Sequence, residues 1–347
     1  MAETSLKDRL LLTTLPAEER ENGRRLLTAL ALIEGKLKQV EEELAVRSRS
    51  PIPTVGEIGE YLMAGGGKRI RPALLLLGAR LFGYDGPLDV KYAATIELLH
   101  TATLVHDDII DEAETRRGRP SVNRRWGNEL TVLFGDYLYM KSMEVSLEPG
   151  DLRVLRLLCE VTLAMTEGEI LGSERRGSID LSLHDYLEIV RRKTALLFAA
   201  ACRIPTFLVE SPPATAEALW NYGLSLGTAF QLQDDLLDYT SSEADLGKPV
   251  LSDLREGKVT LPMILCLPRT TRAERRAVET VVREASFESV SPESMMEIVV
   301  RTGALADARA CAEEWAARAR TALLVLPAGE ARDGLLLAAD YAASRRK

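Results

Sequence analysis

Apolar residues recur at spacings of three and four along most of the chain, whereas the alternation typical of a β-strand is nearly absent. This period predicts amphipathic helices, with Gly, Pro and Ser between them. No shift in composition marks a linker, and no repeat period appears. The sequence therefore predicts a single large all-α bundle. The expected helices cover residues 26–44, 73–82, 88–111, 129–147, 152–171, 183–201, 215–239, 261–265, 272–284, 292–301, 304–326 and 330–344.

Two of these helices contain stretches that are apolar on every side, Ile96–Ile110 and Leu219–Leu237. A helix without a polar face is central and buried. Each stretch ends in the same five-residue acidic pattern, D-D-x-x-D. The six carboxylates are those of Asp107, Asp108 and Asp111, and of Asp234, Asp235 and Asp238.

Residues four apart share one face of a helix, so Asp107 pairs with Asp111 and Asp234 with Asp238. Carboxylates this close in apolar surroundings repel one another unless a cation lies between them. Oxygen ligands favour a hard ion such as Mg²⁺, which binds one or two carboxylates together with phosphate oxygens. A solvated acidic turn is the alternative, but the apolar flanks and the repetition disfavour it. We therefore expect the six carboxylates to converge on shared magnesium.

Basic residues accompany both clusters. The loop GGGKRIRP, residues 65–72, sets glycines and three cations at the start of a helix, which suits anion binding, although it lacks the P-loop spacing. His100 lies two turns before Asp107 on nearly the same face. Together these groups predict a cavity for diphosphate. Further cations are Arg116, Arg117, Arg119, Arg124, Arg125, Lys193, Lys248 and Lys258.

This combination of groups suits one class of reaction. Metal ions stabilise a departing diphosphate, and apolar walls keep water from the allylic carbocation that forms. No Ser/His/Asp or Cys/His set for nucleophilic catalysis is evident in the sequence. The expected chemistry is therefore ionisation of an allylic diphosphate inside a helical bundle with a central cavity.

With these motifs in this order, the chain resembles the trans-isoprenyl diphosphate synthases, the polyprenyl synthetase family. The resemblance runs from about Leu26 to near the C-terminus. It implies the isoprenoid synthase fold, with a catalytic domain over residues 26–347 after a polar extension over 1–25. The segments that carry it are GGKRIRP (66–72), ELLHTATLVHDDIIDEAETRRGRPSVN (97–123), GDYL (135–138), RKT (192–194), FQLQDDLLD (230–238) and DLGKPVLSDLREGKVTLP (245–262).

The resemblance also implies a role for each matching residue. Two to three Mg²⁺ ions would be held by Asp107, Asp111 and Asp234. Asp108, Asp235 and Asp238 would complete or support that shell, and the six aspartates with Lys193 would be the catalytic residues. The allylic diphosphate would be bound by Arg116, Lys193, Thr194, Gln231, Lys248 and Lys258. Isopentenyl diphosphate would be bound by Lys68, Arg71, His100 and Arg117.

The implied reaction is a 1′-4 head-to-tail condensation of isopentenyl diphosphate with geranyl, farnesyl or geranylgeranyl diphosphate. The small Ala102 and Thr103, five and four residues before Asp107, resemble the long-chain synthases, whose all-trans products of roughly C30 to C50 would be precursors of quinone side chains. Met143 is the candidate for a deeper floor. Ala102→Tyr is then expected to shorten the product, although ordinary packing is an alternative role for all three residues.

Three other functions are alternatives to that of a long-chain synthase. A farnesyl or geranylgeranyl diphosphate synthase stays open as the closest alternative. A class I terpene cyclase would lack the GGKRIRP loop and a second all-aspartate cluster, and a non-catalytic subunit would have lost aspartates. Leu251 stands where relatives often have glycine. The family is commonly homodimeric, so a homodimer is expected here.

Composition and charge bear on the partners and the cellular location of the protein. The 44 Lys and Arg residues against 52 Asp and Glu residues give a net charge of −8, which argues against nucleic-acid binding. No signal peptide and no apolar run of membrane-spanning length are evident. The four cysteines, which form no C-x-x-C pair, are expected to be reduced. We therefore expect a cytoplasmic protein.

Overall fold

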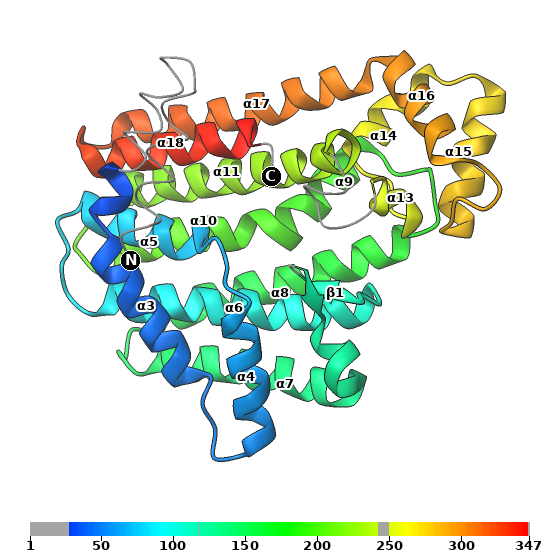
Figure 1. Ribbon diagram of the computed structural model, residues 1–347. Coiled ribbons are helices and arrows are strands. Elements are labelled where there is room, and N and C mark those ends of the chain that lie inside the picture. Colours follow the sequence, from blue (N-terminus) through cyan, green and yellow to red (C-terminus); the bar gives the residue numbers. More distant parts are fainter. Residues whose placement is uncertain (1–27, 117, 242–249, 346–347) are drawn as a thin grey trace, which may run out of the picture.

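The structure, a computed structural model, describes residues 28–116, 118–241 and 250–345, and this part of the chain is almost entirely helical (Figure 1). The predicted all-α class is confirmed. The helices are α3 (Glu34–Arg47), α4 (Pro53–Ala64), α5 (Ile70–Leu81), α6 (Leu88–Ile110), α7 (Val122–Leu147), α8 (Leu152–Arg175), α9 (Leu183–Val190), α10 (Leu196–Arg203), α11 (Pro213–Thr240), α13 (Ser252–Arg255), α14 (Leu261–Cys266), α15 (Arg272–Glu284), α16 (Pro292–Thr302), α17 (Ala304–Ala322) and α18 (Glu330–Ser344).

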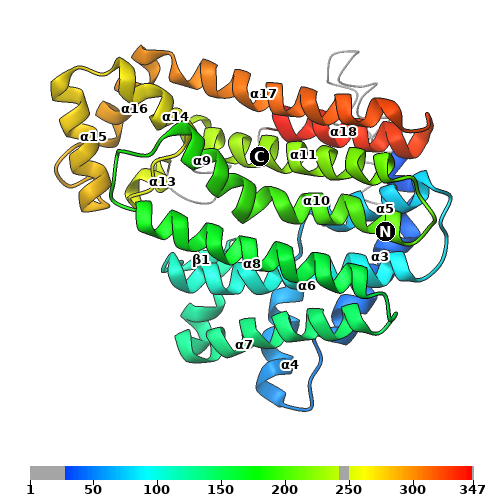
Figure 2. The same ribbon diagram turned by 180° about the vertical axis from the view of Figure 1, so that it is seen from behind.

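The long helices lie roughly parallel in stacked layers (Figures 1 and 2). From one side to the other, α17 and α18 cover α11, which packs on α10, followed by α6 and α8 and then α7. The shorter α15 and α16 cap one end of the stack. This arrangement places α6, α8, α10 and α11 in the middle, where their side chains enclose the interior.

The two helices predicted to be central are deeply buried. Along α6, Ile96, Leu98 and Leu99 are fully buried, and along α11 so are Leu226 and Leu232. Both acidic clusters lie at the carboxyl-terminal ends of these helices. The apolar stretches before the clusters therefore anchor both helices in the core, and the clusters lie in their last turns.

Several elements differ from the sequence-based expectation. No helix was predicted over α13. None was predicted over α4 either, whose two glycines lower its helix propensity; its Ile58 is buried, and a Cβ on Gly59 would lie 2.8 Å from the Ser48 carbonyl oxygen. A two-residue hairpin pairs β1 (Thr115–Arg116) with β2 (Arg119–Pro120). The helix expected over 183–201 contains a π-helical turn, Arg191–Ala195, between α9 and α10.

Some predictions fall outside the described residues. The extension over 1–25, Arg117 and Lys248 are among them, so their predicted roles stay predictions. Within the described ranges, none of the helices has the combination of length and apolar character needed to cross a bilayer.

Candidate active site

Most of the predicted site residues line one cavity of about 660 Å³ in the middle of the bundle. Its walls come from the loop before α5 and from α6, α8, the π-helical turn and α11. A second cavity of about 190 Å³ shares Glu169, Lys193, Thr194 and Gln231 with the first. The predicted residues on the first cavity are Lys68, Arg71, His100, Thr103, Asp107, Arg116, Lys193, Thr194, Gln231 and Asp234. The second adds Asp235 and Lys258.

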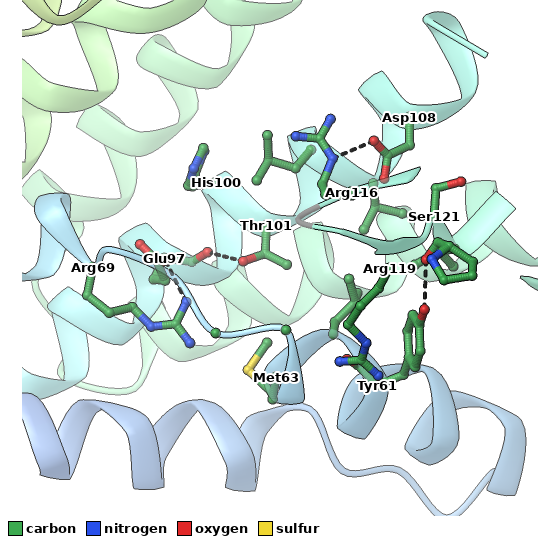
Figure 3. Close-up of a pocket in the computed structure, with 17 residues that line it drawn as sticks. Tyr61, Met63, Arg69, Glu97, His100, Thr101, Asp108, Arg116, Arg119 and Ser121 are labelled. Atoms are coloured by element: carbon green, nitrogen blue, oxygen red, sulfur yellow. Dashed lines mark hydrogen bonds and ion pairs between the residues drawn. The ribbon is translucent and has the colours of Figure 1, made fainter. Parts of the chain in front are cut away.

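The first acidic cluster is divided between two sides of α6. Asp107 faces the large cavity. Asp108 is buried and lines a small pocket on the other side, where its Oδ1 accepts a 2.6 Å hydrogen bond from Nε of Arg116 (Figure 3). Successive residues of a helix point about 100° apart. Asp108 therefore cannot join Asp107, and its contribution is to position Arg116, which lines both the pocket and the cavity.

Charges around Asp107 and Asp111 set their ionisation. Burial raises the pKa of Asp107 to about 6; Lys193 opposes this rise, while Glu169 and Asp111 add to it. Burial alone would also raise the pKa of Asp111, but Lys258 and further cations hold it below its ordinary value. Oδ1 of Asp111 accepts 2.8 Å hydrogen bonds from Lys258 Nζ and from Arg176 Nη2. The negative charge of Asp111 is therefore balanced by neighbouring cations, whereas that of Asp107 is not.

The second cluster is also divided. Asp234 lines the large cavity, and its Oδ1 lies 2.5 Å from Nη2 of Arg345. Asp238 is buried and accepts hydrogen bonds from the backbone N–H groups of Ser252 and Asp253 and from the Ser252 hydroxyl. Asp238 therefore caps α13. Leu251, just before this helix, has φ +59°, a left-handed conformation that glycine adopts without steric cost.

Asp235 anchors a chain of hydrogen bonds between the two cavities. Its Oδ2 accepts from the hydroxyl of Tyr186 at 2.5 Å, and its Oδ1 accepts from Nε2 of Gln231 at 2.7 Å. Oε1 of Gln231 in turn accepts from Thr194 at 2.9 Å. Burial raises the pKa of Asp235 above its ordinary value. Asp235 therefore orients Gln231 and Thr194, two of the predicted diphosphate-binding groups.

The π-helical turn carries Lys193 and Thr194 into the site between two glycines. A Cβ on Gly168 of α8 would lie 3.0 Å from the Lys193 backbone nitrogen, and one on Gly227 of α11 would lie 2.7 Å from the Ala195 Cα. The close approach holds Lys193 at the cavity, where its Nζ is 2.5 Å from Glu169 Oε2. π turns are frequent at functional sites because the extra residue redirects side chains.

The loop before α5 presents cations to the same cavity. Arg69, in the left-handed conformation at φ +48°, donates a hydrogen bond to Glu97 (Figure 3) and is also fixed by hydrogen bonds to Glu41. Its neighbour Arg71 stacks its guanidinium 4.3 Å from the Phe198 ring centroid, and the buried Nε of Arg71 has no hydrogen-bond partner. Burial lowers the pKa of Arg71 to about 10, so it stays charged. An unsatisfied buried donor on a cation suits an anionic ligand.

The carboxylates of Asp107, Asp111 and Asp234 suit a hard divalent ion, but they do not form one compact group. Asp107, Asp111 and Asp234 supply only oxygen, and the raised pKa of Asp107 reflects a negative charge in need of a cation. Among the described residues, however, no three acidic or metal-ligating side chains form a group that could hold a metal ion. Asp108, Asp235 and Asp238 hydrogen-bond to other groups of the protein, and the expectation that all six aspartates converge on shared magnesium stays a prediction.

The three residues predicted to limit product length differ in position. Thr103 lines the large cavity one turn before Asp107, and Phe230 does so one turn before Asp234. Ala102 is 2% exposed in the core, and Met143 is buried in α7, and neither lines the cavity. Ala102 points away because it lies about 100° from Thr103 around the helix. Their assignment as floor residues stays a prediction.

Several groups at the site were not predicted from the sequence. Glu169, Arg176, Tyr186 and Arg345 each contact a predicted site residue. Glu169 carried a weak signal, since Glu167 and Glu169 form a short acidic stretch within α8. Arg176 and Arg345 carried none, because contacts between distant loops leave no periodic pattern.

The chain is similar in sequence to known proteins over most of its length. The sequence matches the model of the Polyprenyl synthetase family over residues 52–299. It is 38% identical to the octaprenyl diphosphate synthase of Escherichia coli K12 over 296 residues, which covers 85% of this chain and 91% of that protein.

Two solved structures are similar throughout. The polyprenyl synthase from Caulobacter crescentus CB15, solved with calcium and isoprenyl diphosphate, has a TM-score of 0.89 at 36% identity and covers 93% of this chain and 98% of its own. The decaprenyl diphosphate synthase from Rhodobacter capsulatus has a TM-score of 0.87 at 37% identity, with coverage of 92% and 98%.

Proposed function

Because the chain belongs to the polyprenyl synthetase family and is a prenyltransferase, we propose that it makes a long-chain all-trans polyprenyl diphosphate. The substrates are isopentenyl diphosphate and an allylic diphosphate, joined head to tail. The octaprenyl and decaprenyl products in the names of two relatives support a long chain. The small Thr103 on the cavity wall supports it as well.

One observation carries the proposal: Asp107 and Asp234, from helices far apart in sequence, line a single cavity that also contains Lys193, Arg71 and an apolar wall. That wall includes Phe198 and Phe230, whose ring centroids are 5.4 Å apart. A cavity lined by both charged and apolar groups matches a substrate with a diphosphate head and a hydrocarbon tail.

Different residues bind the metal ions and the allylic diphosphate in this proposal. Mg²⁺ held by Asp107, Asp111 and Asp234 would neutralise the allylic diphosphate and assist its departure. Lys193, Thr194, Gln231 and Lys258 hold that diphosphate, with Asp235 orienting Gln231. The number of ions, two to three, is part of the proposal.

The second substrate binds on the other wall. Arg71, Lys68 and His100 hold the diphosphate of isopentenyl diphosphate, so that its double bond attacks the allylic cation that remains when the first diphosphate has left. A new carbon–carbon bond forms, and the released diphosphate accepts the proton that is lost. The apolar wall excludes water, which would otherwise capture the cation.

A homodimer completes the proposal. The outer side of α7 exposes Leu133 (58%) and Met140 (62%), seven residues apart, and the outer side of α8 exposes Leu163 (63%) and Ile170 (54%), with the same spacing. The two helices lie side by side on one face of the bundle (Figure 2). Apolar stripes at heptad spacing suit the same stripes of a second copy. Light scattering of the purified protein tests this, and a monomer would contradict it.

The function is tested by product analysis. Purified protein is incubated with Mg²⁺, isopentenyl diphosphate and farnesyl diphosphate, and the product chain length is measured. A product of C30 or longer supports the proposal, whereas geranylgeranyl diphosphate as the largest product would assign the protein to the short-chain alternative. The cytoplasmic location is proposed together with this activity, supported by four cysteines without a disulfide.

A further inference from the structure

The turn that follows α8 is fastened to the turn that carries Lys258. The backbone N–H of Gly177 donates to the Gly257 carbonyl at 2.9 Å. Gly257 has φ +71°, and a Cβ there would lie 2.9 Å from the Val282 carbonyl oxygen and 3.5 Å from Cγ of Arg176. Only glycine fits this contact without strain. The packing therefore fixes Arg176 beside Lys258.

Both cations reach the same oxygen. Arg176 Nη2 and Lys258 Nζ each lie 2.8 Å from Oδ1 of Asp111. Arg176 also lines the 190 Å³ cavity together with Lys193 and Lys258. The Arg176 side chain is 34% exposed. It stands where an incoming diphosphate would meet Lys193 and Lys258.

Resting on the proposed function, we propose that Arg176 is an additional diphosphate-binding residue of this enzyme, and that it pairs with Asp111 only until metal and diphosphate arrive. Asp111 then binds the metal, and Arg176 turns to the diphosphate beside Lys258. A planar guanidinium suits this exchange because it binds carboxylate and phosphate oxygens in the same forked geometry. No bond is made or broken in the step; one ion pair replaces another.

Arg176→Gln tests the exchange by calorimetry, with Mg²⁺ alone and with inorganic pyrophosphate at saturating Mg²⁺. Loss of a competing ion pair is expected to tighten binding of Mg²⁺ alone by about threefold. Loss of a charge-assisted hydrogen bond is expected to weaken binding of pyrophosphate by about tenfold or more. The two affinities thus move in opposite directions, and Arg176→Lys is expected to restore part of the pyrophosphate affinity.

Arg275→Gln is the matched control. Arg275 pairs with Asp180 at 3.1 Å and so tethers the same connection after α8, but it does not line either cavity. Both affinities of this variant should equal those of the wild type. If Arg176 only fastens the turn, then its loss leaves both affinities unchanged or weakens both together, and either result overturns the proposal.

The proposed function is tested separately in the wild type. A wild-type protein that makes a prenyl product yet shows no opposite shift in Arg176→Gln refutes the role of Arg176 alone. A wild type that makes no prenyl product refutes the proposed function, whatever the variant does. Thermal unfolding of Arg176→Gln and Arg176→Lys verifies that both variants are folded.

Discussion

Arg345, the last residue that the structure describes, lies with its guanidinium on Asp234 at 2.5 Å and above the ring of Phe230, 3.8 Å from its centroid. The Arg345 side chain is only 3% exposed, and its Nη2 also donates to the Phe230 carbonyl at 3.0 Å. The Arg345 side chain is therefore bound to the second acidic cluster rather than projecting into solvent.

Arg345→Gln is expected to destabilise the metal-free protein. The variant loses a buried cation–π contact and charge-assisted hydrogen bonds, which together contribute about 2 kcal/mol. Urea titration measures the free energy of unfolding. Arg320→Gln is the control. It removes half-exposed ion pairs to Glu313 of α17 and to Asp340 of α18, and should cost about 1 kcal/mol or less. Equal losses in the two variants would contradict the anchoring role of Arg345.

Asp107 should make the metal-free protein less stable as pH rises. Its pKa is raised by burial to about 6, so the protonated form favours folding, and this contribution is lost as pH rises through the folded-state value. Asp107→Asn should therefore stabilise the metal-free protein relative to the wild type, by about 1 kcal/mol more at pH 8 than at pH 5. Denaturant unfolding at both pH values measures this, and an equal effect at both would contradict it. Prenyltransferase activity should fall at least about 100-fold.

Gly168→Ala is expected to displace the π-helical turn. Its Cβ would lie 2.7 Å from the Cβ of Arg192 and 3.0 Å from the Lys193 nitrogen, so Lys193 must shift. We expect activity to fall by about tenfold, since a displacement of 1 Å at a reacting group costs that much or more.

Gly172→Ala, one turn further along α8, is the matched control. A Cβ there would meet only Ile189 Cγ2, at an ordinary 3.7 Å. This variant should keep its activity and gain about 0.5 kcal/mol of stability, because alanine favours a helix. Steady-state kinetics and thermal unfolding of both variants provide the comparison, and a similar loss of activity in Gly172→Ala would refute the steric argument.

Thr103→Tyr is expected to shorten the product by one or more isoprene units, since its ring would extend from the cavity wall into the path of the growing chain. The rate of the first condensation should change little. Ala102→Tyr, by contrast, would overpack the core and is expected to destabilise the protein by about 1–3 kcal/mol. Product chromatography and thermal unfolding separate the two effects, and an unchanged product length in Thr103→Tyr would contradict the assignment.

The sequence was sufficient to predict the helices with strong periodicity and the chemistry at their ends. α6 and α11 were identified because an apolar run with no polar face has few alternatives to burial. The same acidic pattern at the carboxyl-terminal end of each helix then indicated a shared cavity, and Asp107 and Asp234 do line one.

The partners of the carboxylates were not predictable. Asp108, Asp235 and Asp238 look identical to their neighbours in sequence, and only the helix rotation assigns them to Arg116, Tyr186 and α13. The pairing of Asp111 with Arg176 depends on a contact between two turns, for which single-residue propensities carry no information. α4 was missed for the same reason, because tertiary contact outweighs its low propensity.

Thr103 and Asp107 are one helical turn apart, as are Phe230 and Asp234. If Thr103 limits the growing chain as proposed, a replacement at this one position changes the length of the lipid product while the neighbouring carboxylate keeps its role in bond formation. Divergence in product then needs neither a new fold nor a new mechanism.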